Sequence, residues 1–166
     1  MGIEHDYFGV IESDAAGGLY WSESVEAGDQ EVDVSLSAPG GAQVTDDALE
    51  AAQAFIGALE DIDVRAREAM IGEISTASSD VAAYLLELDD VLGSDVEEYI
   101  SRDSGDRAID VLRSLELLRV ALHPHQAGEG EAFATLEYAL APDETELSLL
   151  VHLSQRGESV GIELLS

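Results

Sequence analysis

The C-terminal stretch ELSLLVHLSQRGESVGIELLS (146–166) alternates apolar and polar side chains on both sides of a short turn segment. Its apolar positions share one face of each run: Leu147, Leu149, Val151 and Leu153 in the first, and Val160, Ile162 and Leu164 in the second. Successive side chains of a β-strand point to opposite faces, so this period of two is typical of strands with one buried face. The stretch therefore predicts two strands joined by the turn residues QRGE (155–158).

The same pattern recurs at both ends of the chain. Upstream, LELLRVALHPH (115–125) and AFATLEYALA (132–141) extend the C-terminal pair to a four-stranded meander. Near the N-terminus, HDYFGVIE (5–12), LYWSESVEA (19–27) and QEVDVSLS (30–37) are separated by turn segments and predict a three-stranded antiparallel meander.

The middle of the chain changes to the period of a helix. Thr45 is suited to cap a helix over 45–60, because the next two residues are acidic and apolar residues then recur at 3.6-residue spacing. A helix over 79–92 begins near Ser79 and ends at Gly93. Shorter helices are expected over 64–74, 95–101 and 105–114.

Strands at both ends and helices between them define the expected fold class. We expect a single α+β domain over 1–166, with a β-meander, central helices and a second β-meander. About seven strands should form one mostly antiparallel or mixed sheet, with the helices on one face and helices 45–60 and 79–92 packed across it.

The charge of the chain restricts its partners. Thirty-six acidic residues face seven arginines and no lysine, which gives a formal net charge of −29. Nucleic acids and anionic membranes attract basic surfaces, so we expect neither as a partner. Two interpretations of the acidity stay open: a surface shaped for a basic protein partner, or a halophilic or proteome-wide background in an acidic scaffold protein.

Missing residue types remove several kinds of chemistry. Without cysteine there are no disulfides, zinc–thiolate sites or thiol nucleophiles, and without lysine there is no Walker A motif or Schiff base. No apolar run approaches the length of a transmembrane helix, and the N-terminal MGIEHDYFGV lacks the basic and apolar regions of a secretion signal. We expect a cytoplasmic protein without a cofactor, and an enzyme is the less favoured class.

The histidines are the only candidates for metal chemistry. His123 and His125 flank Pro124, and in a strand both would point to one face, with Glu137 or His152 as a third ligand after strand pairing. Proline is confined to strand edges and bulges, so the same residues equally fit the end of an edge strand. We expect no metal site, and a small metal-dependent enzyme using His123 and His125 is the alternative.

A binding surface is expected on the polar sides of strands and helices. The aromatic candidate is Trp21, although a buried core tryptophan is the competing interpretation because Tyr20 and Trp21 must face opposite ways. The acidic candidates are those opposite apolar stripes: Glu31, Asp33, Glu87, Asp90, Glu97 and Glu98.

The chain also resembles an uncharacterised bacterial family of small acidic α+β proteins. The resemblance is carried by Phe8-Gly9, by Trp21 in the following strand, and by the terminal strand pair with Gly157 at its turn. Related small acidic proteins are similar to immunity proteins, which protect bacteria by binding toxins. This resemblance implies a cytoplasmic binding or inhibitor module that recognises a basic protein surface.

Overall fold

The computed structural model describes residues 3–13, 18–27, 30–40, 44–100, 104–126, 128 and 130–165. Its strands are β1 (Ile3–His5), β2 (Gly9–Ser13), β3 (Leu19–Ala27), β4 (Gln30–Ala38), β5 (Glu116–Leu122), β6 (Ala134–Ala139), β7 (Ser148–Leu153) and β8 (Ser159–Leu165). Its helices are α1 (Asp46–Gly57), α2 (Leu59–Gly72), α3 (Asp80–Leu92), the 3-10 helix η1 (Gly93–Glu98) and α4 (Arg107–Ser114). The fold is α+β, as the sequence predicts.

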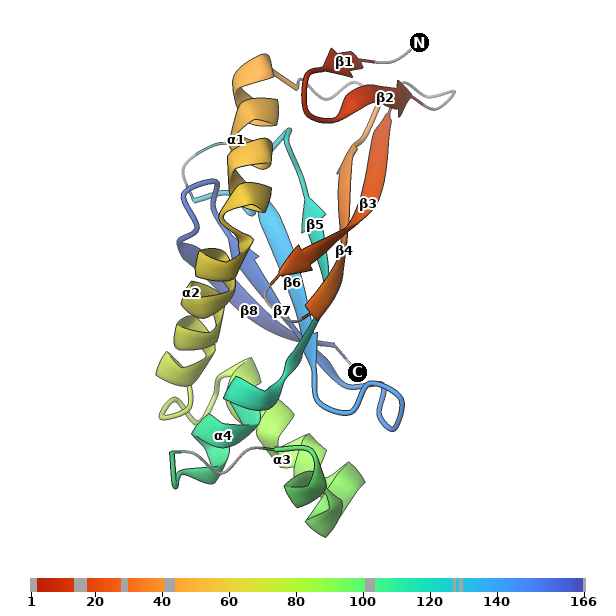
Figure 1. Ribbon diagram of the computed structural model, residues 1–166. Helices are drawn as coiled ribbons and strands as arrows, with labels where there is room; N and C mark the ends of the chain where they lie inside the picture. The colour runs from red at the N-terminus through yellow and green to blue at the C-terminus, as the bar shows by residue number, and fades with distance from the viewer. Residues whose placement is uncertain are drawn as a thin grey trace.

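All strands join one mixed sheet in the order in which they occur along the chain. Strands β3 to β8 form its continuous six-stranded part, and the β1–β2 hairpin extends it through a two-residue ladder between β2 and β3. Every neighbouring pair is antiparallel except β4 and β5, which run parallel. The helical segment is the crossover that this parallel pair requires, and it brings the two predicted meanders side by side (Figure 1).

The N-terminal strand prediction needs correction. The segment 5–12 was expected to be one strand, but it is divided between β1 and β2 by a turn at residues 6–8. Gly9 follows this turn with a φ of +68°, a backbone conformation that glycine adopts without strain, and it pairs with His5. The described residues therefore form one strand more than the seven segments that the sequence predicts.

The helices begin where their capping residues predict. Thr45 accepts a hydrogen bond from the Ala48 N–H at 3.1 Å, and Ser79 does the same for the Ala82 N–H. The predicted single helix over 45–60 is wrong at its end, because the chain turns at Ala58 and α2 begins at Leu59.

The other helix predictions differ from the structure mainly in their bounds. Helix α2 begins earlier than the expected 64–74, and η1 replaces an expected helix over 95–101. Helix α4 occupies most of the expected 105–114, and α3 fills all but the first residue of 79–92.

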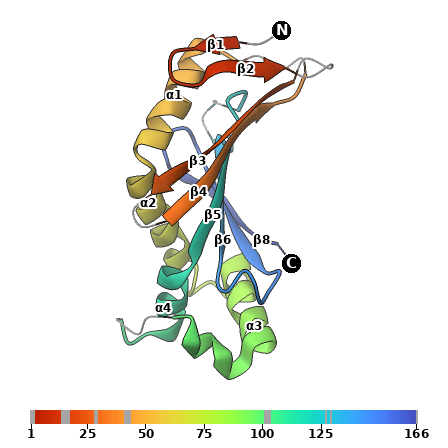
Figure 2. The same ribbon diagram turned by 45° about the vertical axis from the view of Figure 1, so that its right-hand side comes forward.

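Helices cover one face of the sheet. In two views, α1 and α2 run along the same side of the strands, and α3 and α4 lie beyond α2 at the lower end (Figures 1 and 2). The register brings inward-facing apolar residues of five strands into one row: Val34, Val120, Leu136, Val151 and Ile162. The first four are buried, and this row is the centre of the core.

Among the described residues, no helix is long and apolar enough to cross a bilayer.

Candidate functional site

The opposite face of the sheet, which we call the open face, carries the polar residues of the same strands. In the described part of the chain no helix packs on it (Figure 2). Its carboxylates in strands β3 to β8 include Glu26, Glu31, Asp33, Glu137 and Glu163. Arg119 is the one arginine that these strands place there. The open face is therefore acidic, and it is assembled from residues far apart in sequence.

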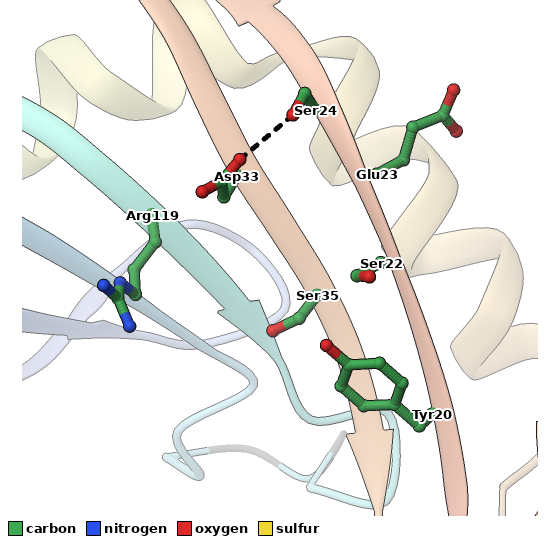
Figure 3. Close-up of a pocket in the computed structure, with 7 residues that line it drawn as sticks. All are labelled: Tyr20, Ser22, Glu23, Ser24, Asp33, Ser35 and Arg119. Carbon is green, nitrogen blue, oxygen red and sulfur yellow. Dashed lines mark hydrogen bonds between the residues drawn. The ribbon is translucent and has the colours of Figure 1, made fainter.

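A shallow hollow of about 420 Å³ lies on the open face over β3, β4 and β5. It is lined by Tyr20, Ser22, Glu23, Ser24, Asp33, Ser35 and Arg119, of which Glu23 points away from the others (Figure 3). The side chain of Ser24 donates a hydrogen bond to one carboxylate oxygen of Asp33 at 3.0 Å. Apart from Glu23, the lining thus combines the Asp33 carboxylate, the Arg119 guanidinium, three serine hydroxyl groups and the phenol ring of Tyr20.

Arg119 closes one side of this hollow without filling it. Its guanidinium lies on the side away from Tyr20 (Figure 3). There it forms an ion pair of 3.2 Å with Glu137, its cross-strand neighbour on β6. Asp33 is its neighbour on the other side, because β4 and β5 are parallel in this register.

Tyr20 and Trp21 lie on opposite faces, as expected for neighbours in a strand. Trp21 is half-buried on the helix side and contacts the β1–β2 hairpin, with its ring 4.7 Å from Phe8 and 6.4 Å from Tyr7 between centroids. Tyr20 is 60% exposed on the open face. The exposed aromatic ring of this strand is therefore that of Tyr20, and Trp21 packs against the core.

A hydrogen-bonded row crosses the open face beside the hollow. Thr135 Oγ1 lies 2.9 Å from His152 Nδ1 and 3.5 Å from His123 Nε2, and His152 Nε2 lies 3.2 Å from a carboxylate oxygen of Glu163. One set of hydrogen positions satisfies all three contacts. His152 donates to Glu163, the Thr135 hydroxyl donates to His152, and His123 donates to Thr135.

In the described part of the chain, this row and His125 are not gathered into one group of potential metal ligands. Strand β5 ends at Leu122, so His125 lies in a turn and not on the strand face that a shared ion would need. The rings of His123 and His125 are 6.2 Å apart, and no group of three or more potential ligands in the described residues is arranged to hold a metal.

Burial sets the protonation of one member of the row. Desolvation lowers the pKa of His123 below its ordinary value of 6.5, and the nearby His125 and His152 lower it further. His123 is therefore held in its neutral form near pH 7.

The six acidic candidates separate into two groups. Glu31 and Asp33 are exposed on the open face at β4. The other four belong to the helical end of the molecule: Glu87, Asp90, Glu97 and Glu98. Of these, Glu97 is half-buried and pairs with Arg107 at 3.4 Å, and the other three are exposed.

Several residues of the site were missed from the sequence. The alternation of β3 placed Tyr20, Ser22 and Ser24 together on the face opposite Trp21, and that signal was present in the sequence. The pairing of Asp33 with Arg119 had no such signal, because it depends on the parallel register of β4 and β5, and the two residues lie 86 positions apart along the chain.

No protein-family model, curated protein or solved structure matches this chain. The class of protein is therefore defined by the structure alone, as an α+β domain with one helix-covered face and one acidic open face.

Proposed function

We propose that this protein is a binding module that recognises a basic protein surface through the open face of its sheet. The observation that carries the proposal is the exposed group on β3 and β4, where Tyr20, Asp33 and the serine hydroxyls surround a hollow on an uncovered face. Tyrosine is enriched among the residues that carry most of the binding energy of protein interfaces.

The electrostatics support a cationic partner. The chain carries a net charge of −29, and its open face adds a local concentration of carboxylates. Such a field accelerates association with a basic partner and opposes non-specific contact with nucleic acid. Toxic nucleases need basic clefts to hold phosphates, so an immunity-type inhibitor of such an enzyme is the proposed role.

The proposal is tested by capture on the immobilised protein at low and high ionic strength, using extract from the source cells. Two double variants remove the same charge from different places: Glu31→Gln with Asp33→Asn on the open face, and Glu87→Gln with Asp90→Asn on α3. We expect a basic protein that is retained at low salt, released at high salt and lost with the open-face variant.

The outcomes distinguish recognition of a basic partner through the open face from an acidity that is only a general adaptation of the protein. Equal capture by both variants contradicts recognition through the open face, and so does the absence of any captured basic protein. For a captured nuclease, the inhibitor role further requires that the wild-type protein block its activity and that the open-face variant fail to do so.

A further inference from the structure

Strand β3 forms an open edge of the sheet over most of its length. The β1–β2 hairpin pairs only with Leu19 and Tyr20 at its beginning, whereas β3 continues beside β4 as far as Ala27 (Figure 1). In an antiparallel ladder, every second residue directs its N–H and C=O groups away from the partner strand. In the described part of the chain, no strand pairs with residues 21–26 on that side, and no side chain hydrogen-bonds to their backbone. This stretch of β3 is therefore free to pair with a strand of another chain.

The edge at the other end of the sheet is treated differently. The Leu164 N–H of β8 donates a 2.8 Å hydrogen bond to a carboxylate oxygen of Asp80, which begins α3. Proteins commonly cover or charge their edge strands, because unpaired backbone groups pair readily with other chains. A helix thus caps β8 at this position, and no described residue does the same for β3 beyond Tyr20.

The side chains along the β3 edge define the segment that would fit beside it. On the helix side of the sheet, Glu23 is exposed between the half-buried Trp21 and Val25. Glu26 is exposed on the open face. Apolar side chains of an added strand would extend the cover of Trp21 and Val25, and basic side chains would pair with the two glutamates. The edge therefore carries negative charge on both of its sides and fits a basic segment.

We propose that the open edge of β3 binds an extended basic segment of the partner protein as an added strand of the sheet. In this mode of recognition, backbone hydrogen bonds supply affinity and the side chains along the edge select the segment. A second copy of this chain fits the edge poorly, because it carries the same glutamates and a net charge of −29. This inference rests on the proposed function and names how the partner is held.

The test is a titration of the ¹⁵N-labelled protein with a synthetic six-residue peptide at constant ionic strength. The peptide is designed to lie antiparallel to residues 21–26, with arginine opposite Glu23 and Glu26. It has valine opposite Trp21 and Val25, and threonine at the other two positions. We expect saturable shifts of the backbone amide signals of residues 21–26 without comparable shifts in β8. The same peptide with glutamate in place of arginine should not bind.

Backbone methylation distinguishes strand addition from simple charge attraction. The N–H groups of a strand alternate between its two edges, so one alternate set of peptide nitrogens faces β3 and the other faces solvent. Two peptides, each methylated on one of these sets, carry the same charge. We expect one to bind like the unmethylated peptide and the other to bind about 10-fold more weakly or worse, because it loses its hydrogen bonds to β3. Equal affinities of the two methylated peptides would show that the inference is wrong.

Matched variants locate the charge that matters. Glu23→Gln with Glu26→Gln should weaken binding of the unmethylated peptide about 3–10-fold, as expected for the loss of two exposed ion pairs. Glu87→Gln with Asp90→Asn removes the same charge from α3 and should leave binding unchanged. Equal weakening by both variants, or shifts that are not confined to β3, overturns the inference. Self-association of the protein through the same amides would assign the edge to a second copy and also overturn it.

The result is distinguishable from failure of the proposed function. Capture of a basic protein through the open face, without localised peptide binding at β3, overturns strand addition and leaves the function standing. Localised peptide binding at β3 without any captured basic protein supports the edge site and overturns the function.

Discussion

At the scale of single residues, one polar cluster joins three elements beneath the sheet. Tyr138 on β6 is fully buried and donates a hydrogen bond of 2.7 Å to Asp63 on α2. Arg67, one turn further along α2, contacts both oxygens of this carboxylate at 3.1 Å. Its Nη1 donates to the carbonyls of Leu112 and Arg113, so it also satisfies the free end of α4.

This cluster predicts the effect of one missing hydroxyl. Tyr138→Phe removes the donor to an ionised, partly buried carboxylate, and such hydrogen bonds contribute about 1.5–3 kcal/mol. We expect the free energy of unfolding to fall by about 1.5 kcal/mol in urea denaturation, near the lower limit because Asp63 keeps Arg67. Tyr99→Phe, at an exposed position, should change it by less than about 0.5 kcal/mol. Equal effects of the two changes would contradict the account.

His123 predicts how stability depends on pH. Burial lowers the pKa of His123 in the folded protein, so the unfolded chain binds this proton more readily. The stability that His123 contributes is therefore fully present above its ordinary pKa of 6.5 and is lost as the pH falls through the lower, folded value.

The measurement compares the urea midpoints of the wild type and His123→Gln at pH 7.5 and pH 5.5. We expect the wild type to lose more stability than the variant over this interval. The carboxylates are common to both proteins, so their contribution cancels in the comparison. A variant that loses as much stability as the wild type would refute the role of His123.

At the scale of elements, the sequence predicted those features that are determined by residues close together along the chain. Period-two runs indicated β3 to β8, and Thr45 and Ser79 marked the beginnings of α1 and α3, because alternation and capping are local. The turn at Ala58 was missed because apolar residues continue through it at helical spacing. The parallel pairing of β4 with β5 could not be predicted from local pattern either. It depends on how the helical segment, which lies between the two strands in the sequence, packs on the sheet.

The β7–β8 turn shows how a terminal hairpin is tied to a helix. Gly157 has a φ of +79°, and a Cβ placed there would lie 2.8 Å from Ile62 Cδ1 and 3.0 Å from Arg65 Nη1. Arg65 itself donates a 3.0 Å hydrogen bond to the carbonyl of Arg156 in this turn. Both neighbouring atoms are the ends of flexible side chains. The positive φ is therefore the main reason why a residue with a Cβ is disfavoured at position 157.

Gly157→Ala should therefore destabilise the protein by about 1–2 kcal/mol, the cost of a left-handed conformation for a residue with a Cβ. Gly161→Ala is the matched control, because Gly161 has no positive φ and a Cβ placed there would meet no atom within 4 Å. We expect that variant to keep wild-type stability or gain slightly. Thermal unfolding of both variants checks the prediction, which fails if their melting temperatures are the same.

At the scale of the whole molecule, the fold sorts a uniformly acidic sequence into distinct surfaces. The acids are spread along the chain, so composition alone could not separate a binding surface from background charge. The sheet gathers Glu31 and Asp33 with Tyr20 on an uncovered face, while Glu87, Asp90 and Glu98 lie at the helical end. If only the long-range field attracts a partner, removing charge at either place should have a similar effect on binding. If the partner contacts the open face, removing charge there should have the larger effect.

The most direct test of the central claim is the association rate constant of the captured basic partner at low ionic strength. It is measured with the wild type and with the two charge-matched double variants. The account predicts that Glu31→Gln with Asp33→Asn slows association several-fold, and that Glu87→Gln with Asp90→Asn slows it much less. Equal slowing by the two variants, or no slowing by the open-face variant, would contradict recognition through the open face of the sheet.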